Sequence, residues 1–235
     1  FAFAFFLAPI DRNRRVAALI VFLIMLGTLL FTQSAGALFI GIPLSLALVL
    51  LLMLRKRALI PLGVLVAAGT MLFAILSNTD RFSRLLTGEG TSFFRIRLWE
   101  SAIQMLKDHP LTGIGLDQFL YLYRGQYIQP DVWQEPNLSH PHNWFLDVWL
   151  RNGIGGILVM LYMLAVFFIS TFKAYLLYFK QAVLLTALTI GTMGSMAGLL
   201  THGLVDNSIF VNDLAIIFML LIGFAVQLSV LSLNE

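Results

Sequence analysis

Residues Val16 to Leu54 read VAALIVFLIMLGTLLFTQSAGALFIGIPLSLALVLLLML, which is 39 consecutive positions without a charged side chain. One helix crosses a bilayer in about 20 residues, so this stretch has nearly twice the length that one crossing needs. An ionised side chain at the bilayer centre costs at least about 2.5 kcal/mol, so long charge-free runs indicate membrane-spanning helices. The polar run Thr32 to Gly36 divides the stretch, and we predict two helices joined there by a tight turn.

The composition of the whole chain agrees with a membrane location. Of the 235 residues, 59% are hydrophobic and 11% are charged, and the mean hydropathy is +0.89. Soluble domains carry about 25% charged residues, so we expect an integral membrane protein. Basic residues that flank membrane helices account for the net charge of +3, and we expect no nucleic-acid partner. The absence of cysteine excludes disulfides, thiolate metal sites and a cysteine nucleophile.

Further charge-free intervals of about one bilayer thickness lie at Ala58–Leu76, Ile154–Phe172, Ala182–Leu200 and Asn212–Ser232. With the two helices above, they predict an all-α integral membrane fold with about six full transmembrane helices. Phe1–Ile10 is too short to cross and is expected to be a remnant helix. Because the chain opens without methionine, we interpret residues 1–235 as a single membrane domain, the C-terminal part of a longer chain.

The basic residues near the helix ends predict the orientation. Counting crossings puts the basic run Asp11–Arg15, the triplet Arg55–Arg57, Lys173 and Lys180 on one side, which should be cytoplasmic. The segment Asn78–Asn152 then faces outward between two transmembrane helices. It holds seven of the 15 Lys and Arg residues and eight of the 12 acids. We therefore expect residues 78–152 to be an extracytoplasmic polar segment of a multi-pass membrane protein.

A helix is predicted at the start of this segment. Ser92 can cap it, and it should run to about Lys107 and stop at His109-Pro110, because the residue before proline disfavours helical backbone. A glycine turn, Leu111–Gly115, follows. We expect a second helix after it, with the Asp117 carboxylate as its N-cap. The glycines fit a plain turn better than a phosphate-binding loop.

Two arginines lie on different faces of the predicted helix. Arg95 and Trp99 are four residues apart and share a face, whereas Arg97 lies about 200° around the axis from Arg95. Arg97 is close to Glu100, so a solvated ion pair is the simplest interpretation. Arg95 beside an interfacial tryptophan suits contact with a phosphate or a lipid headgroup, and snorkelling to the membrane surface is the alternative.

Two histidines flank a proline in the run Ser139-His140-Pro141-His142-Asn143. Histidine is the side chain best able to move a proton near neutral pH, so His142 at a helix start is a candidate general base. A structural role is the alternative for both histidines. The two histidines could also bind zinc, but this is the weaker interpretation, because no third ligand lies at a suitable spacing.

A second polar cluster lies in the run Thr201 to Asn207. His202 and Asp206 are four residues apart and could share a helix face. We expect them either to form a structural hydrogen bond or to line a cavity on the outward side.

Four motifs carry a family resemblance: Arg-Ile-Arg-Leu-Trp-Glu-Ser-Ala (95–102), His-Pro-Leu-Thr-Gly-Ile-Gly-Leu-Asp-Gln-Phe (109–119), His-Pro-His-Asn-Trp-Phe-Leu-Asp (140–147) and Gly-Ile-Gly-Gly-Ile (153–157). In order and spacing the chain resembles the O-antigen ligase and polymerase superfamily from about Val16 to its end. The resemblance implies a membrane glycosyltransferase that moves an oligosaccharide from undecaprenyl diphosphate to a hydroxyl acceptor, such as a glycan or lipid A core. It also implies metal-independent, inverting chemistry without a cofactor. The resemblance further implies a multi-pass protein of the bacterial inner membrane, with residues 78–152 as its extracytoplasmic catalytic segment.

The resemblance also implies roles for particular residues. Arg95 looks like the arginine that grips the diphosphate, and His142 like the histidine that serves the acceptor or donor. The substrate-binding residues expected beside this catalytic pair are Arg97, His140, Trp99, Asn143, His202 and Asp206. Many relatives have Ser-Arg-Gly where this chain has Ser34-Ala35-Gly36, so one phosphate-binding arginine is missing.

Three functions remain open at this stage. The first is a ligase that acts in cell-surface polysaccharide assembly, including lipopolysaccharide, and the second is an O-antigen or exopolysaccharide polymerase of the same superfamily. The third is a non-catalytic transporter or lipid-binding membrane protein. A transporter would more often place ionisable residues in mid-membrane, whereas the charges here cluster at one face.

Overall fold

The computed structural model of the chain describes all residues except 80–81, 84–90, 180, 207–208 and 234–235. Lys180, Asn207 and part of the Asn78–Asn152 segment therefore lie outside the described residues. The described part is helical and has no strand. It forms two compact units: a first unit of Phe1–Thr70, Ala165–His202 and Asn212–Glu235, and a second unit of Met71–Leu164 and Gly203–Val211. The predicted all-α membrane fold is confirmed.

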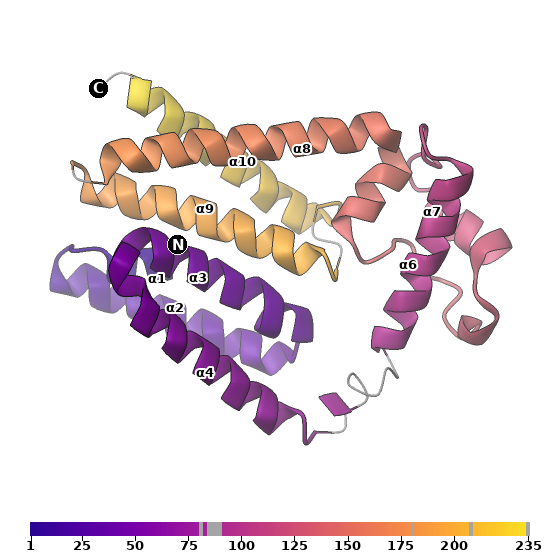
Figure 1. Cartoon of the computed structure of the whole chain (residues 1–235), viewed down its shortest axis with the longest axis horizontal. Coiled ribbons are helices and arrows are strands. Elements are labelled where there is room, and N and C mark those ends of the chain that lie inside the picture. The colour runs from indigo at the N-terminus through magenta and orange to yellow at the C-terminus, as the bar shows by residue number, and fades with distance from the viewer. Residues whose placement is uncertain (80–81, 84–90, 180, 207–208, 234–235) are drawn as a thin grey trace. The chain divides into compact units, whose positions relative to one another are not determined.

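Long apolar helices make up the first unit (Figure 1). The positions where these helices begin and end agree closely with the charge-free intervals, because charged side chains are excluded from the hydrocarbon. The helices are α1 (Ala2–Leu7), α2 (Arg12–Thr32), α3 (Ile42–Leu54) with the preceding π-helix Ala37–Gly41, most of α4 (Leu59–Leu76), the second half of α8 (Trp144–Tyr178), α9 (Val183–Gly203) and α10 (Asn212–Leu233).

The start of α2 differs from the expected basic loop. Asp11 is the N-cap and its side chain accepts a hydrogen bond from the Arg14 backbone N–H at 3.0 Å, so Arg12 to Arg15 form the first turn of the helix. At the other end, α2 stops at Thr32 and Gln33 adopts a left-handed conformation with φ 50°. The turn predicted at Thr32–Gly36 is confirmed.

Five helical stretches are long and apolar enough to cross a membrane among the described residues. One of them, Ala37–Leu76, has 40 residues, about twice what one crossing needs. Arg55, with φ 51°, breaks this stretch between α3 and α4, and a 3-10 turn over Arg55–Ala58 follows. Six crossings remain a prediction, since they require this stretch to count as two.

Small residues on α9 allow α3 to lie close beside it (Figure 1). Ser45 of α3 donates a hydrogen bond from its hydroxyl to the Gly194 carbonyl at 2.7 Å. A Cβ at Gly194 would lie 2.6 Å from Cγ2 of Val49, and a Cβ at Gly198 would lie 3.2 Å from Cβ of Ser45. Close approach at small residues is a common way for membrane helices to associate, because lipid provides no hydrophobic drive between them.

Replacing Gly194 by valine should therefore destabilise the first unit by about 1–3 kcal/mol, because the new side chain overpacks the contact with Val49. Gly223 of α10 is a matched control, since a Cβ there would meet nothing within 4 Å. Thermal unfolding in detergent should show a lower melting temperature for Gly194→Val than for Gly223→Val. Equal melting temperatures would contradict this account of the α3–α9 contact.

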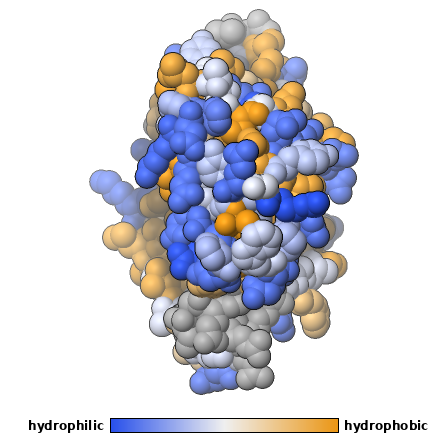
Figure 2. All heavy atoms as spheres, turned by 90° about the vertical axis from the view of Figure 1, so that its right-hand side faces the viewer, coloured by the Kyte–Doolittle hydropathy of each residue, from blue (hydrophilic) through white to orange (hydrophobic). Residues whose placement is uncertain are grey.

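The second unit packs around α6 (Thr91–Asp108). The unit also contains α7 (Phe119–Leu122), a π-helical turn (Tyr123–Tyr127), a 3-10 turn (Pro130–Val132) and the first half of α8. Figure 2 views the side on which α6 and α7 lie, and most of the surface seen there is hydrophilic. The core of the unit consists of Leu98, Ala102, Met105, Leu106, Phe119, Tyr123 and Leu150.

The bounds of α6 agree with the sequence to within two residues. The helix begins at Thr91, so Ser92 lies inside it rather than at the N-cap, and it ends just before His109-Pro110 as predicted. The buried residues Leu98, Ala102 and Met105 recur at helical spacing. Burial of this face fixes the rotation of α6 about its axis and therefore the direction of its polar side chains.

A break at Gly153 divides α8 into two helical parts. Its φ of 67° and ψ of −169° are accessible essentially only to glycine. The break is held by the glycine turn, because the Ile154 N–H donates to the Leu111 carbonyl at 3.0 Å. The N–H groups of Ile114 and Gly115 both donate to the Leu150 carbonyl, at 2.7 and 3.2 Å. These amides are used within the fold, so the plain-turn interpretation of Leu111–Gly115 is confirmed.

Alanine at Gly153 should disrupt this junction, since its Cβ would lie 2.2 Å from the Leu111 carbonyl oxygen. We expect a loss of about 2 kcal/mol or more, because the backbone strain adds to the steric clash. Gly155, two residues along the same helix, meets nothing within 4 Å and provides the control. Melting curves should show Gly155→Ala close to wild type and Gly153→Ala clearly lower; the reverse order would refute the role of the break.

Candidate functional site

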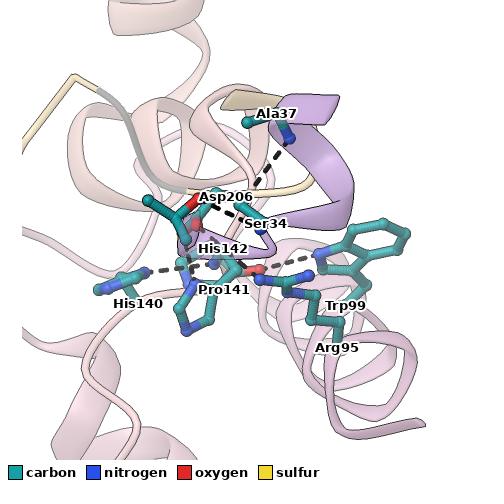
Figure 3. Close-up of polar contacts among 9 residues, drawn as sticks. Ser34, Ala37, Arg95, Trp99, His140, Pro141, His142 and Asp206 are labelled. Carbon is teal, nitrogen blue, oxygen red and sulfur yellow. Dashed lines mark hydrogen bonds and ion pairs between the residues drawn. The ribbon is translucent and has the colours of Figure 1, made fainter. Parts of the chain in front are cut away.

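Three separate parts of the second unit meet at the candidate site (Figure 3). Arg95 and Trp99 come from α6, His140 to Asn143 form the turn before α8, and Asp206 lies in the segment after α9. The fold therefore brings together residues that are more than 100 positions apart.

Trp99 attaches the histidine turn to α6. Its indole N–H donates a hydrogen bond to the Pro141 carbonyl at 2.8 Å. Trp99 is on the same helix face as Arg95, as the four-residue spacing predicts. The bond therefore sets the turn opposite the arginine, and in Figure 3 both side chains of α6 extend toward it.

Asn143 holds the turn from the other side. Its side-chain oxygen accepts hydrogen bonds from the N–H groups of Phe145 and Leu146 at 3.0 and 3.1 Å, which makes it a cap of α8. Its amide N–H donates to the Leu204 carbonyl at 2.9 Å and so links the turn to the segment that carries Asp206. Between these anchors, His142 adopts φ 51°, a left-handed conformation that costs about 1–2 kcal/mol for a non-glycine residue.

A carboxylate and a guanidinium accompany His142. Nδ1 of His142 lies 2.8 Å from Oδ1 of Asp206, and Nη2 of Arg95 lies 3.8 Å from Oδ2 of the same carboxylate. An ionised carboxylate can only accept, so Nδ1 carries the proton and Nε2 of neutral His142 holds the lone pair. The side chains of Arg95, His142 and Asp206 are 30%, 26% and 34% exposed, so a ligand can reach all three.

His140 packs against His142 but has a different electrostatic environment. The two ring centroids are 4.2 Å apart, and the His142 backbone N–H donates to Nδ1 of His140 at 3.3 Å. Burial, then the nearby His142 and Arg151, lower the pKa of His140 to about 4, although Asp206 acts in the opposite direction. His140 is therefore neutral near pH 7 and serves as a hydrogen-bond acceptor for the turn.

Arg97 points to a different set of partners. It forms ion pairs at 2.7 Å with both Glu100 and Asp131, and its guanidinium lies 5.3 Å from the Phe93 ring centroid. Hydrogen bonds to the two acids raise the pKa of Arg97 above its usual value. The predicted Arg97–Glu100 pair is confirmed, and a substrate-binding role for Arg97 stays a prediction.

Asp117 does not cap a helix, so that prediction is wrong. Gln118 is the N-cap of α7 and makes no side-chain capping bond. Asp117 instead has φ 57° and pairs with Arg151 of α8. The physical reason is the guanidinium, which offers the carboxylate a charged partner 34 positions away.

His202 belongs to the first unit, where it lies near the end of α9 against Gly41; a Cβ there would be 3.0 Å from the His202 Cβ. The expected contact between His202 and Asp206, and a role for His202 in the site, stay predictions. The sequence pattern did not reveal the pairing of Asp206 with His142.

Among the described residues, no group of three or more His, Asp or Glu gathers at metal-binding distance.

A sequence profile described as O-antigen ligase matches residues 20–161. The chain belongs to this family. The match includes Arg95 and His142, whereas Asp206 lies beyond its end. The superfamily resemblance that the four motifs indicated is thus confirmed.

One curated relative is an O-antigen ligase from Pseudomonas aeruginosa. It is 29% identical over 180 residues, which cover 77% of this chain and 40% of the relative. The chain therefore spans about 40% of the length of the curated relative it matches.

The lowered pKa of His140 predicts a pH dependence of stability. An unfolded histidine titrates near pH 6.5, but folded His140 takes up its proton only near pH 4. The unfolded state therefore binds more protons between these values, and stability should fall as the pH drops from about 6.5 toward 4. Asparagine at position 140 keeps an acceptor but does not titrate.

Melting temperatures at several pH values in this window test the effect. Wild type should lose more stability on acidification than His140→Asn does, and the exposed His109→Asn should resemble wild type. If His140→Asn and wild type lose stability in parallel, burial of His140 does not control this pH dependence.

Proposed function

We propose that this chain carries the reaction centre of a membrane glycosyltransferase of the ligase type. The enzyme transfers an oligosaccharide from undecaprenyl diphosphate to a hydroxyl acceptor in cell-surface polysaccharide assembly. The observation that carries the proposal is the contact of His142 with the Asp206 carboxylate at 2.8 Å, with the Arg95 guanidinium beside it. Family membership supports the same conclusion.

His142 acts as the general base. Asp206 accepts the hydrogen bond from Nδ1–H, which orients the imidazole and leaves Nε2 to receive a proton. As the acceptor hydroxyl attacks the anomeric carbon, its proton moves to Nε2 and a new C–O bond forms. Asp206 then stabilises the imidazolium that results, which makes it a positioning residue for the base.

Arg95 stabilises the leaving group. The bond between the anomeric carbon and the diphosphate oxygen breaks, and its electron pair leaves with undecaprenyl diphosphate. A guanidinium binds phosphate oxygens in a fixed fork, and it stabilises the charge that develops on them. The 3.8 Å distance to Asp206 is longer than a hydrogen bond. This ion pair therefore leaves the N–H donors of Arg95 available to phosphate oxygens. Because this chain has Ala35 where many relatives have arginine, that position supplies no second guanidinium for the diphosphate.

The attack and the departure occur on opposite sides of the anomeric carbon, so the proposed reaction inverts its configuration. We propose that it uses no metal, with the Arg95 guanidinium offsetting part of the negative charge on the diphosphate. The proposed setting is the outer side of the inner membrane, with residues 78–152 as the extracytoplasmic catalytic segment. The predicted cytoplasmic location of the basic triplet Arg55–Arg57 supports this orientation.

Membranes that contain the protein, given radiolabelled undecaprenyl-diphosphate oligosaccharide and excess EDTA, provide the test. His142→Ala should lower the transfer rate by about 10²–10⁴-fold, the usual range for a lost general base. Arg95→Ala should lower it by roughly 10²–10³-fold through lost charge stabilisation. Asp206→Asn should lower kcat more than it changes KM, because it disturbs the base and not the binding of substrate.

Arg124→Ala is the matched control, since Arg124 is exposed and its hydrogen bond goes to the Asn137 side chain at 3.3 Å. This variant should retain the wild-type rate. Transfer of the label as one band indicates a ligase, and a ladder indicates a polymerase. If wild type moves no label with any lysate acceptor, or if Arg95→Ala retains full activity, the proposal is refuted.

A further inference from the structure

The glycine turn carries an apolar surface that the proposed reaction does not use. Leu111 and Leu116 are 69% and 64% exposed, although they flank the tightly bonded turn between α6 and α7. About two thirds of each residue is thus available to an external partner. The turn itself is rigid, because Gly113 has φ 65° and a Cβ there would lie 2.4 Å from the Leu150 carbonyl oxygen.

The position of this turn along α8 indicates what the partner is. The 21 residues from Asn152 to Phe172 carry no charge, and at about 1.5 Å per residue they extend about 31 Å along the helix. The hydrocarbon core of a bilayer is about 30 Å thick, so this interval must begin close to the membrane surface. The Ile154 N–H bonds to the Leu111 carbonyl at 3.0 Å, which places the turn at that level.

Neighbouring side chains agree with this level. The indole N–H of Trp149 donates to the Pro110 carbonyl at 2.9 Å, and tryptophan is enriched where membrane meets water. Further along α8, Leu158 is 60% exposed, as expected of a helix that faces lipid. On the other side of the turn, the charged Asp117 pairs with Arg151. These charges restrict the turn to the interfacial layer.

We propose that the Leu111–Leu116 turn is an interfacial anchor, which inserts both leucines among the upper acyl chains of the outer leaflet. The occupant of the apolar surface is the lipid bilayer. The turn is bonded to α8, on which Leu158 is exposed as expected of a residue that faces lipid.

The anchor has a consequence for α6, which ends at Asp108 just before the turn. Within the second unit, α6 runs across residues 154–164 of α8 rather than alongside them (Figure 1). Since α8 crosses the membrane, the anchor holds α6 along the membrane surface. Arg95 is thereby kept near the level at which the phosphates of membrane lipids lie.

Site-specific fluorescence tests the proposal in a full-length protein whose cysteines outside residues 1–235 are first replaced by serine, since residues 1–235 contain none. Single cysteines replace Leu111, Leu116, Leu158 and Glu135 in the full-length protein. Each variant is labelled with an environment-sensitive nitrobenzoxadiazole dye and placed in lipid nanodiscs. Leu158→Cys is the lipid-exposed reference, and the exposed, charged position of Glu135→Cys is the aqueous reference. Lipids with a quencher near the headgroup or near the chain end report the depth.

The dyes at positions 111 and 116 should emit at shorter wavelength than the dye at position 135. They should also be quenched more by lipids labelled near the headgroup than by lipids labelled near the chain end. Emission and quenching equal to those at position 135 would overturn the proposal, and would leave the surface to a protein partner. The result does not depend on transfer activity, so it is independent of the proposed function.

Discussion

A buried carboxylate sets the strongest constraint on the second unit. Asp147 is fully buried at the start of α8, and Arg151 one turn later lies 2.9 Å from it. Removing one partner of a buried ion pair costs about 3–5 kcal/mol, because the other charge stays desolvated. Arg151 also pairs with Asp117 and lies 4.8 Å from the Phe210 ring centroid. One arginine thus joins α8, the glycine turn and the segment that carries Asp206.

The arrangement of the candidate site follows from these attachments. The histidine turn precedes Asp147 directly, and the Asp206 segment is held by Phe210 and by the Asn143–Leu204 hydrogen bond. Within that frame, two histidines of the same turn acquire different properties. His140 is kept neutral by burial, whereas His142 faces a carboxylate that fixes its proton on Nδ1. The difference arises from the neighbours of each ring.

Local features of the fold could be predicted from the sequence. The helix ends follow charges and prolines, so the end of α6 before His109-Pro110 was located correctly. The Arg97–Glu100 pair was also predicted, because a spacing of three residues is visible in the sequence. Contacts that depend on the tertiary fold were missed. The sequence predicted a capping role for Asp117, whereas its partner is Arg151, and it did not reveal the pairing of Asp206 with His142.

The separation of His142 from Asp206 also has a consequence for biosynthesis. The two residues are 64 positions apart, and α9 lies between them. A ribosome that adds about 5–20 residues per second takes roughly 3–13 s to cover this interval. During that time the nascent chain has Arg95 and His142 but not the carboxylate that pairs with His142. The candidate site can therefore assemble only after α9 has been synthesised, late in the translation of this part of the chain.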